Sequence, residues 1–279
     1  VAFSKEQAEA GLFMADSQTN RTIASCEQFL SNQEQHYLID SFIERLESVN
    51  FLDADTRNTY EAEHIAILKE SVFPAYEYLI TELQNLKGRC KNQYGLAWFE
   101  QGKEYYELLV RDATGSEKSV EALQALIGEN MSSDFNMLVK LGLEHPEAFR
   151  NMDICPVDLS NPEMVLLLLK EQIAKDFPIN ADFDFSVQMV PKAIEEYTNP
   201  AYYILPPLDK MNQNYIFINQ SAFLGGIEDF VTLAHEGFPG HLYQTTYFYG
   251  CEPCHLRKLF SFNGYCEGWG TYAELYAYT

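Results

Sequence analysis

The sequence predicts an α+β protein that is mainly helical and carries a small β-sheet. Apolar residues recur at three- and four-residue spacing through the first two thirds of the 279-residue chain. Short aromatic and β-branched runs, bounded by Pro, Asn and Asp, follow after about Phe177. Hydrophobic residues make up 47% of the chain, which is enough for a folded core.

Two capping patterns predict where N-terminal helices begin. Ser4 with Gln7, and Ser31 with Glu34, fit capping boxes, in which each side chain accepts a free backbone N–H of the other residue. A helical stripe of apolar residues follows Ser31.

The middle of the chain predicts further helices. The helical pattern over Asp55–Leu86 contains Pro74, which should kink or split it. Helices are expected around Gly102–Arg111 and over Ser119–His145. Asn161 opens another, because a capping residue is followed by proline at the first turn.

The last hundred residues combine strands and helices. Strands are predicted at Phe183–Val190, Ala201–Leu205 and Asn214–Ile218. A helix over Ile227–Ala234 and a last one from near Phe262 follow. We therefore expect an N-terminal helical region over 1–177, then a part over 178–279 that holds the strands and the helices of the site described next.

Charge and hydropathy argue against several classes of protein, namely those that bind nucleic acid or anionic lipid and those that span a membrane. The net charge of −22 argues against binding to nucleic acid or to anionic lipid, both of which need a basic surface. The longest apolar run has six residues, 164–169, whereas a membrane span needs about 20.

The chain opens at Val1 without an initiator methionine or signal peptide, so either a leader was removed or the sequence is a cut piece. The compartment stays open, with the cell envelope or secretion favoured over the cytoplasm.

Histidine spacing is the most informative feature. The stretch from His235 and Glu236 to Pro239-Gly240-His241 begins like the zinc-protease motif His-Glu-x-x-His, but its second histidine comes two residues late. On a regular helix, a six-residue step leaves the two side chains about 120° apart and about 9 Å along the axis. They could not then share one ion at Zn–N distances of about 2.1 Å. A break at Pro239, with Gly240 in the left-handed conformation, would bring His241 back against His235.

A catalytic zinc takes three protein ligands and keeps one position for water. The third candidate is Glu267, on the helix predicted after His241. Glu274 lies seven residues further on the same helix face, with Thr271 between, so either could hold a ligand in place. Gly264, Gly268 and Gly270 are costly in a helix, which predicts close packing against the metal helix.

These motifs resemble the bacterial family of unknown function 885 (DUF885), which is grouped with the zincin-like metallopeptidases of the gluzincin type. The specific ones are His-Glu-Gly-Phe-Pro-Gly-His and Glu-Gly-Trp-Gly-Thr-Tyr-Ala-Glu; the supporting motifs begin near Gly102. The resemblance implies a zincin-like helical architecture and Zn²⁺ on His235, His241 and Glu267. It further implies Glu236 as the general base of peptide hydrolysis.

Three features depart from the family pattern. Leu242 stands where a second histidine is common, and Gly270 replaces a more usual alanine. The sequence stops at Thr279, whereas family members continue, so we expect a C-terminal truncation. Apolar residues cover more than one side of the last helix, which predicts a missing segment or a partner chain over it.

Further residues have weaker candidate roles. A phenol of Tyr202 or Tyr203 could stabilise a developing oxyanion, and Arg257 could bind the terminal carboxylate of a peptide substrate. Two alternatives to a peptidase stay open. Cys251, Cys254 and His255 fit the Cys-x-x-Cys-His pattern of c-type haem attachment, although a disulfide or two plain thiols explain the cysteines as well. The second alternative is a catalytically inactive helical binding or structural domain.

Overall fold

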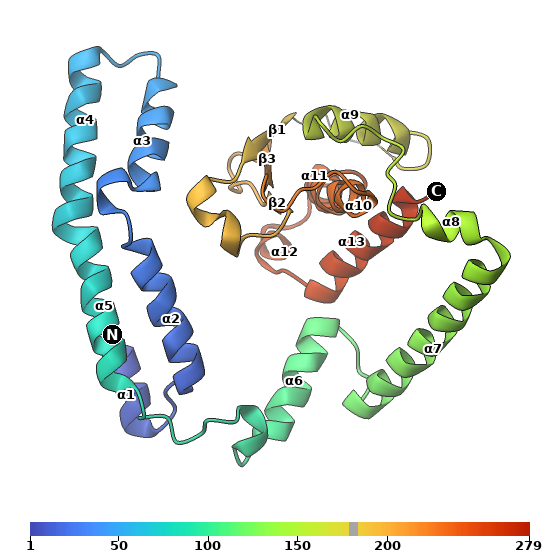
Figure 1. Ribbon diagram of the computed structural model, residues 1–279, viewed down its shortest axis with the longest axis horizontal. Coiled ribbons are helices and arrows are strands. Elements are labelled where there is room, and N and C mark those ends of the chain that lie inside the picture. The colour runs from blue at the N-terminus through green and yellow to red at the C-terminus, as the bar shows by residue number, and fades with distance from the viewer. Residues whose placement is uncertain (179–183) are drawn as a thin grey trace. The chain divides into compact units, whose positions relative to one another are not determined.

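The computed structural model describes residues 1–178 and 184–279 and confirms the α+β class, with many helices and a small sheet (Figure 1). The chain forms two compact units, Val1–Tyr106 and Glu107–Thr279. The sequence change near residue 177 lies within the second unit, so the division at 177/178 stays a prediction about domain organisation. Among the described residues, no helix is both long and apolar enough to cross a membrane.

The first unit is built from helices that pack in pairs. α2 packs against α5, and α3 packs against α4. Their buried apolar side chains form two clusters, one around Phe13 and Leu83 and the other around Leu68 and Phe73. The elements are α1 (Ala2–Ala10), α2 (Asp16–Phe29), a 3₁₀ turn (Gln33–Gln35), α3 (Tyr37–Glu47), α4 (Ala54–Ile67), a π-helical segment (Leu68–Val72), α5 (Phe73–Leu86) and a 3₁₀ turn (Leu96–Trp98). α6 (Gly102–Thr114) leads into the second unit.

Both predicted capping boxes are wrong. α1 begins at Ala2, so Ser4 lies inside the helix. α3 begins at Tyr37, where the ring Nδ1 of His36 accepts the N–H of Leu38 at 3.3 Å. His36 is buried among aromatic rings and fills the capping position that serine was expected to fill.

The second unit packs α9 and α10 against a three-stranded sheet. Its elements are α7 (Val120–Glu144), α8 (Pro146–Arg150), α9 (Pro162–Ile173), β1 (Asp184–Met189), a 3₁₀ segment (Lys192–Tyr197), β2 (Ala201–Ile204), β3 (Gln213–Ile218), α10 (Ile227–Glu236), α11 (His241–Gly250), α12 (His255–Leu259) and α13 (Asn263–Ala277). The order is β1-β3-β2, with β1 parallel and β2 antiparallel to β3. The predicted strands and closing helices are confirmed, except that Phe183 lies outside the described residues.

Local sequence explains the borders of these elements. The hydroxyl of Ser119 accepts the N–H of Ala122 and starts α7, which runs unbroken to Glu144. The Asn161 side chain likewise accepts the N–H of Met164 before α9, as predicted.

The core of the second unit lies around α10. This helix packs against α13, α9, β2 and α11, and Figure 1 shows α10 and α11 between α9 and α13. Leu233, Phe238 and Leu242, from the end of α10 to the start of α11, are fully buried. This burial fixes the backbone on both sides of the histidine pair.

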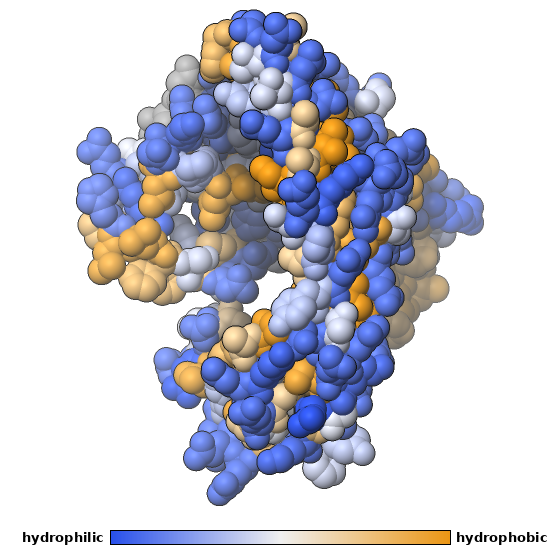
Figure 2. Space-filling model, turned by 90° about the vertical axis from the view of Figure 1, so that its left-hand side faces the viewer, coloured by the Kyte–Doolittle hydropathy of each residue, from blue (hydrophilic) through white to orange (hydrophobic). Residues whose placement is uncertain are grey.

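Figure 2 shows a largely hydrophilic face on which hydrophobic side chains gather in a few patches. On α13, Tyr272, Leu275 and Tyr278 are exposed, whereas Trp269 and Tyr276 pack against the core. What covers the exposed side of α13 stays a prediction.

Candidate metal centre

The chain breaks between the two histidines, as the sequence predicted. α10 ends at Glu236 and α11 begins at His241. The peptide bond between Phe238 and Pro239 is cis. The expected left-handed glycine is wrong, because Gly240 has φ −73° and ψ −138°.

Gly240 is needed for a different reason, which is the close approach between the start of α11 and the end of α10. Its N–H donates to the carbonyl oxygen of Ala234 at 2.9 Å and draws the start of α11 onto the last turn of α10. A Cβ at position 240 would collide with the backbone carbonyls of Ala234 and His235. Only a residue without a side chain allows this approach, and the approach brings His241 beside His235.

Three side chains converge at this break. The rings of His235 and His241 lie with centroids 4.5 Å apart and planes at 89°. The Oε2 atom of Glu267, which lies on α13, is 3.6 Å from Nε2 of His235 and 3.8 Å from Nε2 of His241. One ligand atom from each residue lies within 4.8 Å of the others.

This donor set fits a zinc ion. Two ligands bound tetrahedrally at about 2.1 Å from one ion are about 3.4 Å apart, which is near the separations of Glu267 from the two histidines. The set has two imidazole nitrogens and one carboxylate, a combination found in catalytic zinc sites. The side chains of His235 and His241 are largely buried and that of Glu267 is half exposed, so one side of the centre faces outward.

Glu274 holds the first histidine. Its Oε1 lies 2.6 Å from Nδ1 of His235. An ionised carboxylate can only accept, so this contact uses the proton on Nδ1, and in the neutral tautomer with that proton Nε2 has the lone pair that can bind a metal. This arrangement is the second contact that metal-bound histidines commonly make.

The glycines of α13 have separate explanations. A Cβ at Gly270 would lie 2.5 Å from Cε1 of His235, so this glycine lets α13 pack on the imidazole as predicted. A Cβ at Gly264 would meet the carbonyl of Thr114 instead. Gly268 has no atom within 4 Å of such a Cβ, so the packing explanation is wrong for this position.

Glu236 lies next to the ligands and is largely buried within the protein. The main-chain N–H of Tyr203, on β2, donates to its Oε2 at 2.8 Å. Burial raises the pKa of the Glu236 carboxyl; the Tyr203 N–H and His235 oppose this rise, and the charge of Glu267 adds to it.

Burial also affects the second histidine. It lowers the pKa of His241, with a further lowering from His235; Glu267 and a hydrogen bond with Gln244 act in the opposite direction. A neutral imidazole is the form that binds metal. The environment of His241 therefore favours its ligand form.

The weaker candidates lie elsewhere. The Thr271 hydroxyl donates to the Glu267 carbonyl, within its own helix. Tyr202 stacks on Phe217, and the Tyr203 hydroxyl donates to Asn214 at 2.8 Å, so neither phenol is shown bonded to a member of the centre. Arg257 lies over the ring of Phe248 on α11.

Contacts of Trp269 and Gln244 were also missed by sequence reasoning. The indole Nε1 of Trp269 donates to the carbonyl oxygen of Pro239 at 2.6 Å and ties the break to α13. Gln244 hydrogen-bonds His241 and donates to the carbonyl of Tyr265 at 3.3 Å. The glycine-rich motif containing Trp269 was a signal for close packing, but nothing in the sequence names a carbonyl as its partner.

Comparison with known proteins identifies the family. The family described as "Bacterial protein of unknown function (DUF885)" matches residues 2–133 and 163–278. The chain belongs to this family. Among solved structures, the DUF885 chain is similar to "the putative lipoprotein from Colwellia psychrerythraea", with a TM-score of 0.80 and 18% identity. The match covers 99% of this chain and 51% of the other, so this chain spans about half that length.

The likeness to that structure shows the fold alone, because the identity is low. No curated protein matches the DUF885 chain. The family match confirms the resemblance found in the sequence, whereas the zincin-like grouping and the zinc chemistry go further and are proposed below.

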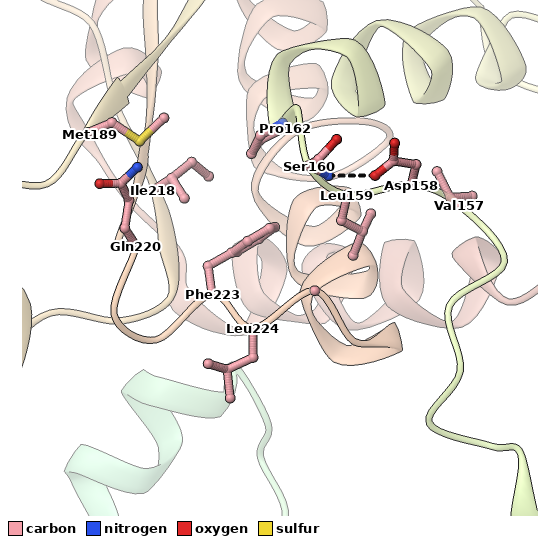
Figure 3. Close-up of a pocket in the computed structure, with 11 residues that line it drawn as sticks. Val157, Asp158, Leu159, Ser160, Pro162, Met189, Ile218, Gln220, Phe223 and Leu224 are labelled. Atoms are coloured by element: carbon pink, nitrogen blue, oxygen red, sulfur yellow. Dashed lines mark hydrogen bonds between the residues drawn. The ribbon is translucent and has the colours of Figure 1, made fainter.

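A cavity of about 580 Å³ is lined in part by Gln244, which hydrogen-bonds His241. Tyr265 and Cys266 also line it, and Glu267 follows Cys266 directly in the chain. A second cavity, of about 480 Å³, is lined by none of the predicted site residues. Figure 3 shows Phe223 extending toward Leu159 there, beside the hydrogen bond between Ser160 and Asp158.

The cysteine pair of the DUF885 chain lies on the surface. Cys251 follows α11 and Cys254 precedes α12, and both are exposed and outside any disulfide. The two thiols are therefore not joined in this structure. Haem attachment at Cys251, Cys254 and His255 stays an untested alternative, and visible absorption of the pure protein would test it.

Proposed function

We propose that this chain is the metal-binding part of a zinc-dependent peptidase that hydrolyses peptide bonds. One observation carries the proposal: Nε2 of His235, Nε2 of His241 and a carboxylate oxygen of Glu267 converge at separations that fit one tetrahedral zinc. The contact of Glu274 with His235 supports it, because it orients the ligand tautomer.

Zinc held by these three residues would supply an activated water and a Lewis acid for the substrate carbonyl. Glu236 is the base in this proposal. Its carboxyl interacts electrostatically with His235 and Glu267, so it lies near two of the proposed ligands, where it can accept a proton from the attacking water and pass it to the leaving amine.

Tyr203 orients this base through its backbone. Its N–H holds one oxygen of Glu236, which fixes the carboxylate plane. Because this donor is the main-chain N–H, a substitution of residue 203 by any residue except proline would keep it. The phenol of Tyr203, by contrast, is already hydrogen-bonded to Asn214.

β2 offers a surface for an extended peptide. It is an edge strand of the described sheet, next to α10, which ends at the centre. An added peptide strand could use main-chain hydrogen bonds there and place a carbonyl near the three ligands. The acidic charge of the chain disfavours strongly acidic peptides as substrates.

The proposal is tested by separating the base from a ligand. Glu236→Gln should keep zinc and lose hydrolysis by at least about 100-fold, because an amide cannot accept the proton. Glu267→Gln should bind zinc more weakly, because the charged ligand is removed. Zinc content by mass spectrometry and cleavage of a peptide library by each zinc-loaded protein would measure both effects.

Two outcomes would overturn this assignment. Equal zinc loss in both variants would show that the roles of Glu236 and Glu267 are misassigned. Zinc bound at one ion per chain without any peptide cleavage would favour the binding or structural domain over the peptidase.

The location of the protein in the cell belongs to the same proposal. The structural neighbour is described as a lipoprotein, and lipoproteins are held at the cell envelope, so we extend the envelope location to this chain. The activity of the full-length protein, and any contribution of residues beyond this chain, are likewise proposals. Fractionation of cells followed by immunodetection would test the location.

A further inference from the structure

We propose that the cavity beside the candidate metal centre binds the C-terminal carboxylate and a bulky apolar side chain of a peptide substrate. The inference rests on the proposed peptidase function and assigns it a substrate class: peptides trimmed near their C-terminus. Arg257 and Lys258 bind the carboxylate in this assignment, and the aromatic wall binds the apolar side chain.

The cavity is large and mostly apolar. Its volume of about 580 Å³ lies within the roughly 300–1,000 Å³ of typical ligand sites. Phe248, Tyr249 and Phe262 contribute aromatic rings to its lining, and Leu205 contributes an aliphatic side chain. A wall of this kind favours a bulky apolar group over a small polar one.

The charges of the cavity differ from those of the chain as a whole. Arg257 and Lys258 line it, and Asp112 is the one carboxylate among its lining residues. The local balance is therefore positive, although the chain carries a net charge of −22. A carboxylate is the complement of that balance, and the planar guanidinium of arginine can bind it by two parallel hydrogen bonds.

The two cations lie over the aromatic wall. The guanidinium carbon of Arg257 lies 5.6 Å from the ring centre of Phe248, and Nζ of Lys258 lies 5.4 Å from that of Tyr249. Within the described ranges, neither forms an ion pair. The same two rings line the cavity, so the cations and the apolar surface can meet one ligand.

The cavity also adjoins the proposed site of cleavage. Leu205 directly follows β2, the edge strand on which a peptide could extend, and Gln244 contacts both His241 and the cavity. A peptide that passes the centre and ends in the cavity would present a bond near its C-terminus to the ligands. A free chain end, with no further residues to accommodate, suits a cavity of this limited size.

Binding can be measured without hydrolysis. The probe is a fluorescein-labelled pentapeptide that ends in phenylalanine, as the free acid and as the amide, titrated into the zinc-free 279-residue protein and followed by fluorescence anisotropy. We expect the acid to bind at least about tenfold tighter than the amide, because a charge-assisted hydrogen bond is lost. Replacing the terminal phenylalanine with serine should weaken binding by a similar factor.

Variants locate the contact. Arg257→Gln should bring the ratio of acid to amide affinity close to one, and Lys258→Gln should reduce it. Arg89→Gln is the matched control, since it removes one exposed cation of the first unit and should leave the ratio unchanged. Because Arg257 is exposed, its replacement should not unfold the protein.

Three results would overturn the inference: equal binding of acid and amide, an unchanged ratio in both cavity variants, or equally tight binding of an amidated peptide with an internal glutamate. The last result would assign the carboxylate to a side chain. The peptidase proposal fails separately: if zinc-loaded protein cleaves neither peptide while the acid still binds selectively, the cavity stands and the hydrolytic function does not.

Discussion

Two prolines interrupt helices in this protein, and the results differ. Before Pro74, α4 passes through the π-helical segment Leu68–Val72 into α5, and the chain keeps its direction (Figure 1). At Pro239, α10 ends and α11 begins as a separate helix. A proline alone interrupts the hydrogen bonds of a helix, but it does not decide where the chain goes next.

The residues around each proline explain the difference. Ala75 follows Pro74, and Ile67, Val72 and Phe73 at the borders of the π segment keep right-handed helical conformations. Gly240 follows Pro239, and its N–H reaches back to Ala234. The comparison indicates that Gly240 lets the start of α11 pack closely on the last turn of α10. This close packing brings the residues of the candidate centre together.

The largest effect is expected from Gly240→Ala. The added Cβ would collide with two backbone carbonyls of α10, so α11 must move away. We expect the free energy of unfolding to fall by about 3 kcal/mol and zinc affinity by about 100-fold or more. Urea unfolding and zinc titration measure the two effects.

The matched control lies at the other proline. Ala75→Gly should cost about 1 kcal/mol, the helix preference of alanine over glycine, and leave zinc affinity unchanged. If Gly240→Ala were as mild as this control, the break would not depend on close approach.

A second effect concerns the contact that orients His235 at the end of α10. Glu274→Gln should lower zinc affinity by roughly 10- to 100-fold, because the carboxylate that fixes the imidazole tautomer is removed. Thr271→Val is the control, since that hydroxyl bonds only to its own helix. Equal zinc affinity in Glu274→Gln and wild type would contradict a positioning role for Glu274.

A smaller effect is expected where α13 ties the break at Pro239. Trp269→Phe removes the donor to the Pro239 carbonyl and should cost about 1–2 kcal/mol of unfolding free energy, with zinc affinity falling a few fold. The chain has one other tryptophan, Trp98, which is 69% exposed. Trp98→Phe should therefore change neither quantity, and a similar loss in both variants would point to a general effect of tryptophan removal.

Sequence patterns predicted much of this fold, because the spacing of apolar residues within a helix or strand indicates which of its faces is buried. The three strands and the cap at Asn161 follow from local spacing. The kink or split predicted at Pro74 is wrong, because the chain continues as helix from the π segment through α5. The cap of α3 does not follow from local spacing, because His36 is held by aromatic packing from several helices, and a serine nearby satisfied the local rule equally well.

The candidate site likewise has some features that the local sequence predicts and others that depend on tertiary packing. The histidine spacing, the helix breaker and Glu267 could be read from the sequence, because the proposed zinc site would demand those residue types. The hydrogen bond from Tyr203 to Glu236 could not, since it comes from a main-chain N–H that every residue except proline has. The conformation of Gly240 was missed for a related reason: glycine permits many conformations, and packing selects one.

The smallest effect is expected from Pro74→Ala. Leu68 and Phe73 are both buried in one cluster, yet five residues on a regular α-helix turn about 500°, which leaves their side chains about 140° apart. The wider π turn brings them to one face, so burial of this pair, rather than the proline, should hold the π segment. Pro74 is exposed at the first turn of α5, and alanine there should cost only about 0.4–1 kcal/mol through the unfolded chain. Urea unfolding would measure this loss, and a stabilisation of more than about 1 kcal/mol would instead show that the proline forces the π segment against the preference of the helix.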